Sequence, residues 1–287
     1  MKRALVTGVT GFIGSHLARR LVMLGYDVHS VSRERSDFWR VKDIAPRLKN
    51  HTLDLVRNQE KLKKEVEKIN PDYIFHLAAA GLHAGTSSSD KELFEANVVG
   101  TANLINACDG VNYRLFVNTG SSSEYGLKNR PIKESDDCEP NTLYGVTKLG
   151  GTLYGQMIFR TKQKPVVTVR VFSPFGPHDD EQRFLSRLVR DSLAGRDLKL
   201  SQPKVARDYI YIDDLVEAHI AALKIPGFAN YNLGTGKGTK IIDLLKLVFK
   251  ICDKKAPISD LGKREGDPQI LIASYEKAKK ELGWEPK

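Results

Sequence analysis

The chain has 287 residues, 41% of them hydrophobic and 28% charged, and its formal net charge is +10. This composition excludes a disordered chain, and the length suits one large α/β domain or two unequal lobes. The N-terminus leaves no room for a signal peptide ahead of its first apolar run, and no apolar run approaches membrane-spanning length. A cytoplasmic protein without a membrane partner is therefore expected.

The excess positive charge has an ordinary source in lysine-rich helices. In and just beyond residues 60–68, Leu62, Val66 and Ile69 form an apolar stripe, and the lysines fall on the opposite side. A basic surface can attract nucleic acid through long-range fields, but solvated helix faces explain most of this charge. Nucleic acid is therefore not the expected partner.

Apolar runs alternate with amphipathic stretches through the first 172 residues, which is typical of repeated βαβ units and a parallel sheet. The pattern predicts strands at 2–8, 27–32, 51–55, 72–79, 114–120 and 166–172. It predicts helices at 12–24, 58–70, 91–108 and 144–160. The predicted fold is α/β, a doubly wound parallel sheet of the Rossmann type.

After Phe172 the texture changes, and a helix is predicted at about 183–194 in a smaller second lobe. Residues 209–234 then resemble a return to the first lobe, so the two units should be interleaved. We predict a Rossmann domain from 1–172 plus about 209–236. The smaller, C-terminal substrate lobe would comprise about 173–208 plus 237–287.

Three glycines, Gly8, Gly11 and Gly14, lie between the first strand and its helix. Glycine permits a tight turn and the close approach of a ligand, and the helix N-terminus attracts anions through its free N–H groups. Because the loop follows a strand and opens a helix, it predicts the pyrophosphate site of a dinucleotide.

The second strand ends at Ser32-Arg33-Glu34-Arg35, where a protein that prefers NAD usually carries an acidic residue for the ribose 2′-hydroxyl. Arginine suits a 2′-phosphate because its guanidinium can donate two charge-assisted hydrogen bonds. This favours NADP over NAD, unless Arg33 and Arg35 simply belong to a solvated loop. Asp54, further along, could accept from the adenine amine or cap a turn.

Tyr144 and Lys148 are four residues apart in a predicted helix, so their side chains project from one face. A nearby ammonium stabilises a phenolate, which would make Tyr144 a usable acid or base. Tyr275 and Lys279 share this spacing without a nearby glycine loop or strand end, so spacing alone proves little. What distinguishes Tyr144 is the preceding strand, which delivers Ser121 to the edge where α/β proteins bind ligands.

No metal site is predicted. The three cysteines, Cys108, Cys138 and Cys252, lack the spacing of zinc ligands, so they are expected to be reduced thiols. His76 and His83 have no ligand partner at useful spacing.

These segments together resemble the extended short-chain dehydrogenase/reductases, of the NAD-dependent epimerase/dehydratase type. The resemblance rests on TGVTGFIG, HLAAA, NVVGT, the serines before EYG, YGVTK and ARDYIYIDD, and it extends to the closing LGWEP. It therefore covers nearly the whole chain, with the motifs in the family's order. It implies enzymes that act on nucleotide-activated sugars and a homodimer formed through the helices around 91–108 and 144–160.

The resemblance also implies roles for individual residues. Ser121 would be the catalytic hydroxyl, with Ser122 as the alternative; Tyr144 would be the acid–base group, and Lys148 would orient the nicotinamide ribose. The implied cofactor contacts are Gly8, Gly11, Phe12, Ile13, Gly14, Ser32, Arg33, Asp54, Leu55, Ala78, Ala79, Asn97, Tyr144, Lys148 and Phe172. The implied substrate contacts are Ser122, Ser123, Ser173, Arg207 and Arg264, although Arg207 could instead pair with Asp208 or Asp213.

The reaction stays open between two main alternatives. Dehydratases of this family carry an acidic pair after the catalytic hydroxyl, where this chain has Ser122 and Ser123, and Glu124 would point elsewhere if the segment stayed extended. The arginines favour reduction of a 4-keto, 6-deoxy sugar with NADPH. The alternative is a nucleotide-sugar epimerase with tightly bound NAD, and a third reading is a cofactor-sensing or RNA-binding protein without catalysis.

Overall fold

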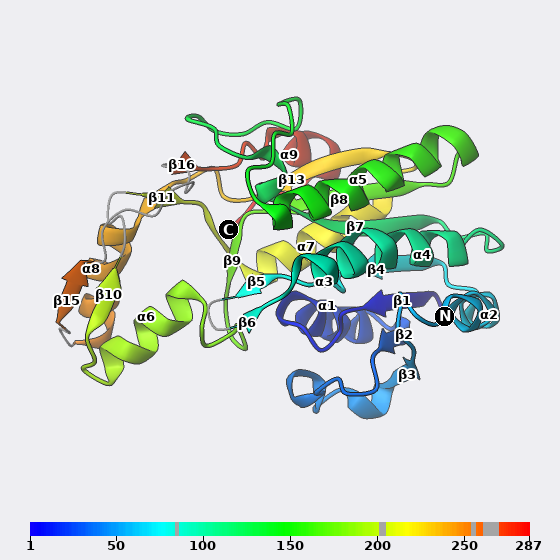
Figure 1. The fold of residues 1–287 in the computed structure, drawn as a ribbon, viewed down its shortest axis with the longest axis horizontal. Helices are drawn as coiled ribbons and strands as arrows, with labels where there is room; N and C mark the ends of the chain where they lie inside the picture. The colour runs from blue at the N-terminus through cyan, green and yellow to red at the C-terminus, as the bar shows by residue number, and fades with distance from the viewer. Residues whose placement is uncertain (84–85, 201–204, 254–256, 261–269) are drawn as a thin grey trace.

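The computed structural model describes residues 1–83, 86–200, 205–253, 257–260 and 270–287. A seven-stranded parallel sheet forms its centre, in the order β13-β8-β7-β4-β1-β2-β3 (Figure 1). Its strands are β1 Arg3–Thr7, β2 Asp27–Ser32, β3 Leu48–Thr52, β4 Tyr73–His76, β7 Leu115–Ser121, β8 Val166–Val171 and β13 Ala229–Leu233. The strand order runs in opposite directions from β1, so the predicted doubly wound sheet is confirmed.

Helices cover both faces of the sheet (Figure 1). Helices α2 (Gln59–Ile69), α4 (Gly100–Ala107) and α5 (Leu143–Lys162) pack on one face, and α3 (Asp90–Phe94) contacts α5. The other face carries α1 (Phe12–Met23), α7 (Ile212–Ala221) and α9 (Glu276–Leu282). Strands covered on both sides read as continuous apolar runs, which is why β8 is rich in valine and buried throughout.

One predicted strand is displaced: the third strand is β3 at Leu48–Thr52 and not 51–55. This edge strand is largely exposed, so it lacks the apolar run that marks the inner strands. The apolar residues that suggested a strand flank Asp54, whose carboxylate accepts from the backbone N–H groups of Val56 at 2.8 Å and Arg57 at 3.1 Å. That Asx turn ends the extended chain.

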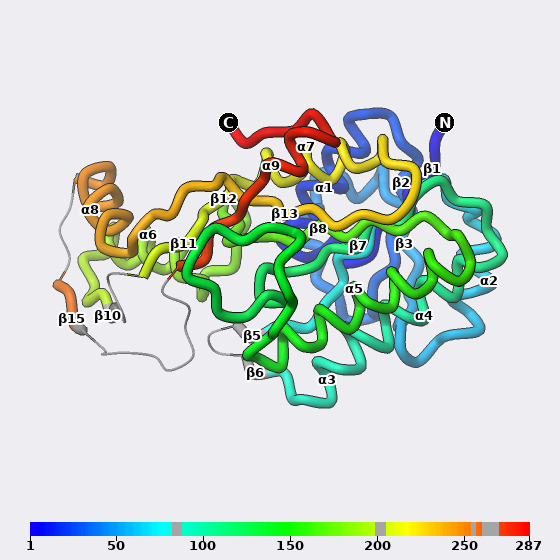
Figure 2. Tube along the Cα trace, turned by 90° about the horizontal axis from the view of Figure 1, so that it is seen from above, coloured from blue at the N-terminus to red at the C-terminus, as the bar shows by residue number. Residues whose placement is uncertain are grey.

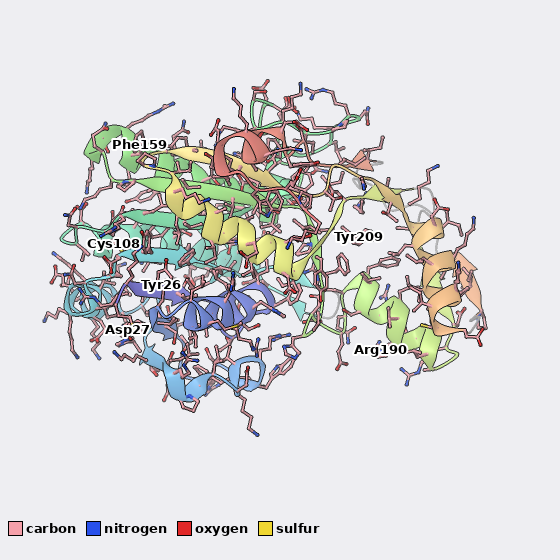
Figure 3. All side chains as sticks on the ribbon, turned by 180° about the vertical axis from the view of Figure 1, so that it is seen from behind. Tyr26, Asp27, Cys108, Phe159, Arg190 and Tyr209 are labelled. Atoms are coloured by element: carbon pink, nitrogen blue, oxygen red, sulfur yellow. The ribbon has the colours of Figure 1, made fainter. Side chains whose placement is uncertain are left out.

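A smaller lobe stands at one end of the sheet in Figures 1 and 2. Helices α6 (Phe184–Leu193) and α8 (Ile241–Cys252) pack around Leu188 and Leu245, and strand β10 (Leu198–Leu200) pairs with β15 (Ile258–Asp260). Short paired strands connect the two units: β9 Ser173–Phe175 with β12 Tyr209–Tyr211, and β11 Ala206–Arg207 with β14 Thr239–Lys240 and β16 Ile270–Leu271. Figure 3 shows Tyr209 between the large sheet and α6, which carries Arg190.

The chain passes between these units more than once. After the first passage through the smaller lobe, α7 packs against α1 and β13 pairs with β8 in the large sheet. This arrangement agrees with the expected interleaving, and the domain boundaries given above stay a prediction. No helix within the described residues is long and apolar enough to cross a membrane.

Candidate active site

The glycine loop forms a tight cradle at the start of α1. Gly8 has φ +75°, and a Cβ at Gly14 would lie 2.1 Å from the Gly8 carbonyl oxygen, so both positions require glycine. The cap residue Gly11 is exposed and has no side chain to cap the helix. The amides of Phe12 and Ile13, in the first turn, therefore lack intrahelical acceptors and favour an anion. This geometry fits a dinucleotide pyrophosphate.

The end of β2 does not resolve the choice of dinucleotide. Arg33 and Arg35 are exposed, while buried Ser32 donates to the side chain of Asn50 at 2.9 Å. Asp54 caps its own turn, which was one of its two predicted roles, and Leu55 accepts a hydrogen bond from Asn103 at 2.8 Å through its carbonyl.

Asn97 holds the loop that follows β4. Its side chain accepts from Ala80 N at 2.8 Å, donates to Ala80 O at 2.9 Å and donates to the Thr147 hydroxyl at 3.0 Å. It lies in a π-helical turn, Glu95–Val99, which divides the helix predicted at 91–108. Ala78 at the loop start is fixed by Thr7, whose hydroxyl accepts from its N–H at 3.2 Å, and Ala79 follows it. Asn97 thus shapes the loop predicted to face the cofactor.

His76 has a structural role. Its Nδ1 lies 2.8 Å from the Thr7 hydroxyl and its Nε2 lies 2.9 Å from the Thr101 hydroxyl. Burial, with a smaller contribution from Lys148, lowers the pKa of His76 to about 3, so the ring is neutral. Among the described residues no group of His, Cys, Asp or Glu side chains could hold a metal ion, and the three cysteines are free.

Ser121 and Tyr144 meet where β7 ends beside the first turn of α5. Thr142 caps this helix by accepting from Gly145 N at 3.1 Å, which starts the helix just before Tyr144. The Ser121 hydroxyl accepts from Ser123 N at 3.1 Å and lies near enough to the Tyr144 phenol to lower its pKa. Lys148 follows one turn later and is 8% exposed. The three side chains predicted to act together are therefore brought together.

Burial is the largest cause of the pKa shifts of Tyr144 and Lys148. It raises the pKa of Tyr144, and the charge of Glu124 raises it further, while the hydrogen bond from Ser121 and the charge of Arg183 oppose them. In the chain alone, Ser121 and Arg183 provide the lowering, and the expected effect of the Lys148 ammonium on Tyr144 stays a prediction. Burial lowers the pKa of Lys148 to about 8, against the smaller raising effect of Glu124.

Replacing Lys148 with methionine is expected to stabilise the cofactor-free protein at pH 7. Burying this ammonium costs at most about 3 kcal/mol, because its pKa falls from 10.5 to about 8 on folding. Between those pH values the unfolded chain binds more protons, so the stability of the wild type rises with pH. Thermal unfolding should therefore show a higher Tm for K148M at pH 7 and a gap that closes towards pH 10. A variant less stable at pH 7 would contradict this.

Tyr275 and Lys279, the second pair with the Tyr–Lys spacing, lie in a different environment from Tyr144 and Lys148. Tyr275 precedes α9 and its ring packs edge-on against Trp284, with centroids 6.3 Å apart. Lys279 pairs with Glu285 at 2.6 Å on the surface. This pair is structural, and the strand end beside Tyr144 is what separates the two.

The other residues predicted to contact the substrate or cofactor differ in how exposed they are. Ser122 is buried and Ser123 half-buried in the turn after Ser121, while Ser173 is half-buried at the start of β9. Phe172 is buried against Tyr125, which leaves only its backbone for the predicted cofactor contact. Arg264 lies outside the described residues.

Arg207 lies in β11 and donates to the Ala206 carbonyl at 3.2 Å. The neighbouring Asp208, one suggested partner, accepts four hydrogen bonds at 2.6–3.0 Å. They come from Thr235 N, Thr235 Oγ1, Gly236 N and Ala273 N. The Asp208 carboxylate therefore holds neighbouring loops together.

Sequence reasoning missed two charged groups near Tyr144. The segment after Ser121 is a 3-10 turn, Ser122–Tyr125, and not an extended strand, and it turns Glu124 into the interior. The S-x-x-E pattern from Ser121 to Glu124 is a capping-box signal that could have revealed this. Arg183, the cap residue of α6, acts on Tyr144 from the other lobe, and no local pattern in the sequence indicates that approach.

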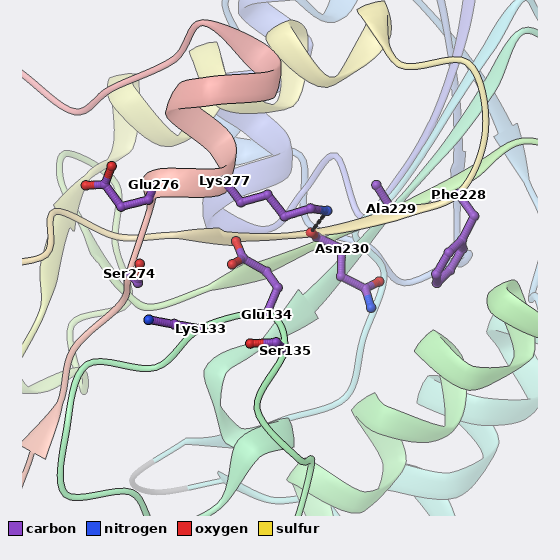
Figure 4. Close-up of a pocket in the computed structure, with 9 residues that line it drawn as sticks. All are labelled: Lys133, Glu134, Ser135, Phe228, Ala229, Asn230, Ser274, Glu276 and Lys277. Carbon is purple, nitrogen blue, oxygen red and sulfur yellow. Dashed lines mark hydrogen bonds between the residues drawn. The ribbon is translucent and has the colours of Figure 1, made fainter.

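A cavity of about 590 Å³ lies elsewhere, at the outer edge of β13 (Figure 4). It is lined by Lys133, Glu134, Ser135, Phe228, Ala229, Asn230, Ser274, Glu276 and Lys277. Lys277 donates to the carbonyl of Asn230 at 2.9 Å within it. None of the predicted site residues lines this cavity, so it is not part of the candidate active site.

Comparisons with known proteins agree on one family. A sequence model of the NAD dependent epimerase/dehydratase family matches residues 4–234. The UDP-glucose 4-epimerase GEPI48 of Cyamopsis tetragonoloba is 32% identical over 319 residues, which cover 99% of this chain and 90% of that protein.

Two solved structures share the whole fold. A UDP-glucose 4-epimerase from Thermotoga maritima with UDP-glucose has a TM-score of 0.91 at 28% identity, covering 99% of this chain and 94% of that one. A UDP-glucuronic acid 4-epimerase from Bacillus cereus, in complex with UDP-glucuronic acid and NAD, has a TM-score of 0.89 at 27% identity, with the same coverage. The predicted family resemblance is therefore confirmed.

Proposed function

This chain belongs to the NAD dependent epimerase/dehydratase family, and from that premise we propose that it is a nucleotide-sugar 4-epimerase with NAD as its resident cofactor. The observation that carries the proposal is the approach of Ser121 to Tyr144 at the carboxyl end of β7, with Lys148 one helical turn away. The relatives described above are themselves 4-epimerases of UDP-sugars.

The epimerase alternative replaces the reductase that the sequence favoured. The preference for NADPH and a keto sugar rested on Arg33 and Arg35, and both are exposed. The B. cereus structure contains NAD, and NADP preference has no support from these relatives. Dehydration lacks its acid pair, since Ser122 and Ser123 occupy those positions and Glu124 is engaged in the interior.

The roles of the chain's own residues follow from the geometry. Gly8, Gly11 and Gly14 with the first amides of α1 would hold the cofactor pyrophosphate, and Lys148 would orient the nicotinamide end. Bound there, NAD would supply the hydride acceptor and donor that a change of configuration at the sugar C4 requires. Tyr144 would take the proton of the C4 hydroxyl and give it back, with Ser121 donating a hydrogen bond to the same oxygen.

Bound NAD would also help to ionise Tyr144, whose pKa burial raises in the chain alone. The positive charge of oxidised nicotinamide favours a nearby phenolate, because opposite charges stabilise the ionised form. Cofactor binding would thus favour the ionised form of Tyr144.

The direct test of the proposed function offers the protein UDP-glucose or UDP-glucuronic acid and follows the C4 epimer by NMR. An epimer formed without net change in nicotinamide absorbance supports the proposal; stoichiometric oxidation of NADPH by a 4-keto sugar would refute it.

We propose a homodimer through the outer face of α5 and the neighbouring α3 region. Five large apolar side chains are exposed there: Phe94, Val99, Val146, Leu153 and Met157, at 39–52%. On α5 they follow a helical stripe, and clustered exposed apolar residues mark association surfaces.

Replacing Leu153 with lysine is expected to convert the dimer to a monomer, because a charge would be buried at the centre of that face. Sedimentation velocity would measure the mass. Ile251→Lys provides the control, since Ile251 is 73% exposed on α8 in the other lobe. A wild type that sediments as a monomer would remove the proposal.

A further inference from the structure

Glu124 lies at the centre of a buried polar network behind the catalytic side chains. It is fully buried, and its Oε1 accepts from Ser121 N at 2.9 Å. Its Oε2 accepts from the Thr152 hydroxyl at 3.0 Å and from Arg170 Nε at 2.7 Å. One carboxylate thus joins the end of β7, the helix α5 and the strand β8.

The contact with Thr152 links Glu124 to the Tyr–Lys helix. The Thr152 hydroxyl also lies 3.3 Å from the carbonyl oxygen of Lys148, one turn earlier on α5. Glu124 therefore bonds on one side to the backbone of Ser121 and on the other to the turn that carries Lys148. No other described carboxylate acts on the protonation of both Tyr144 and Lys148.

Gly120 supplies an independent observation. A Cβ at Gly120 would lie 2.5 Å from Glu124 Oε1 and 2.8 Å from Thr168 Cγ2. Gly120 has no left-handed φ that would otherwise require glycine. The residue before the catalytic serine is therefore small because the Glu124 carboxylate occupies the space beside it.

We propose that Glu124 is the positioning residue of this site: its buried carboxylate fixes the backbone of Ser121 against the helix that carries Tyr144 and Lys148. The inference rests on the proposed epimerase function. Arg170 pairs with Glu124 inside the protein and donates in turn to the Tyr125 hydroxyl at 2.7 Å. Glu124 does not face the reacting sugar, because its oxygens are engaged on the interior side.

The charged and titratable groups around the site are few. Glu124 raises the pKa of both Tyr144 and Lys148, while Arg183 lowers that of Tyr144 from the start of α6. Among the described residues, the other groups near this site are Arg170 on β8, the Tyr125 phenol and Cys138 beside it, and His76 at the end of β4, which is neutral. Removing the Glu124 charge should therefore lower both pKa values and move both limbs of the pH–rate profile to lower pH.

Three variants separate the effect of the Glu124 charge from the effect of its side-chain length. Glu124→Gln keeps the size and removes the charge; we expect kcat to fall about tenfold and both limbs to move by about one pH unit. Glu124→Asp keeps the charge but cannot span the same contacts, so kcat should fall by about 10- to 100-fold with unmoved limbs. The double variant E124Q/R170Q avoids an unpaired buried guanidinium, and its limbs should move like those of E124Q.

Glu134→Gln is the control, because Glu134 joins the same network at another point, where it accepts from Asn232 N at 2.8 Å. NAD affinity and KM should change by less than about threefold in every variant. If E124Q and E124D fold and keep the wild-type kcat and pH profile, the proposal is overturned. It is also overturned if the loss of kcat in E124Q only follows a loss of folded protein and the limbs of its pH–rate profile do not move.

Failure of the proposed function would be recognised separately, as a wild type without epimerisation. The ionisation of Tyr144 can then be followed without turnover, from the difference in phenolate absorbance between each protein and its Tyr144→Phe counterpart. A midpoint lower in the E124Q background supports the role of the Glu124 charge. An equal midpoint contradicts it.

Discussion

Replacing Tyr144 with phenylalanine is expected to lower turnover by about 10³-fold with little change in NAD affinity. The phenol hydroxyl is the group placed to move the proton of the sugar C4 hydroxyl, and it lies near Ser121 at the strand end. Phenylalanine keeps the ring and removes only that oxygen. Turnover should be measured by NMR of the sugar product, and NAD affinity by titration of the same protein.

The chain supplies a matched control for this variant. Tyr275 has a lysine at the same spacing, but its ring packs on Trp284 and that lysine pairs with Glu285 on the surface. Tyr275→Phe should therefore retain nearly the full turnover of the wild type. Unchanged turnover in Tyr144→Phe would remove the acid–base assignment, whatever the control shows.

Replacing Gly14 with alanine is expected to damage both the fold and cofactor binding. The added Cβ would meet the Gly8 carbonyl oxygen at 2.1 Å and Val9 Cα at 3.1 Å, so backbone must move. Such overpacking costs about 3 kcal/mol, which corresponds to a fall in Tm of roughly 6–12 °C. NAD affinity should fall by more than about tenfold, because the displaced loop no longer presents its amides.

Gly11→Ala separates these two effects. A Cβ at Gly11 meets nothing nearer than the Gly8 oxygen at 3.2 Å, and its backbone conformation is open to any residue. The variant should keep its Tm within about 2 °C but weaken NAD binding, because the methyl group would project where the pyrophosphate is expected. If Gly14→Ala bound NAD as tightly as the wild type, the assignment of the loop would fail.

Local patterns predicted the parts of the site that depend on local geometry. The position of the glycine loop between a strand and a helix predicted the cradle around Gly8 and Gly14, and helical spacing placed Tyr144 and Lys148 on one face. The alternation of buried strands and amphipathic helices predicted the sheet. These features repeat with the period of the backbone, so the sequence records them directly.

Features set by tertiary approach were not predicted. Alternation along a strand placed Glu124 away from the site, but β7 ends at Ser121 and the next four residues coil inwards. Arg183 reaches the neighbourhood of Tyr144 from α6, which only the interleaved chain path brings near. The pKa of Tyr144 rises because burial outweighs its favourable neighbours, and burial depends on packing that a motif does not encode.

The preference for NADP over NAD gained no support from the structure, for a related reason. Two arginines after β2 suggested a phosphate contact, but a side chain's type does not determine where it points, and exposed arginine is common. The relatives are 4-epimerases, which favours epimerisation over the reduction that the arginines suggested. The site residues predicted the chemistry that reduction and epimerisation share, which is hydride transfer with a tyrosine as the acid–base group.

The most direct test of the central claim follows the hydrogen at C4 of the sugar. A UDP-sugar carrying deuterium at C4 would be incubated with the protein, and its C4 epimer examined by NMR and mass spectrometry, with NADPH present as a competing reductant. A 4-epimerase with resident NAD returns the same hydride, so we predict that the product keeps its deuterium and that NADPH is not consumed. No epimer from any UDP-sugar, together with one NADPH oxidised for each 4-keto sugar reduced, would contradict the account.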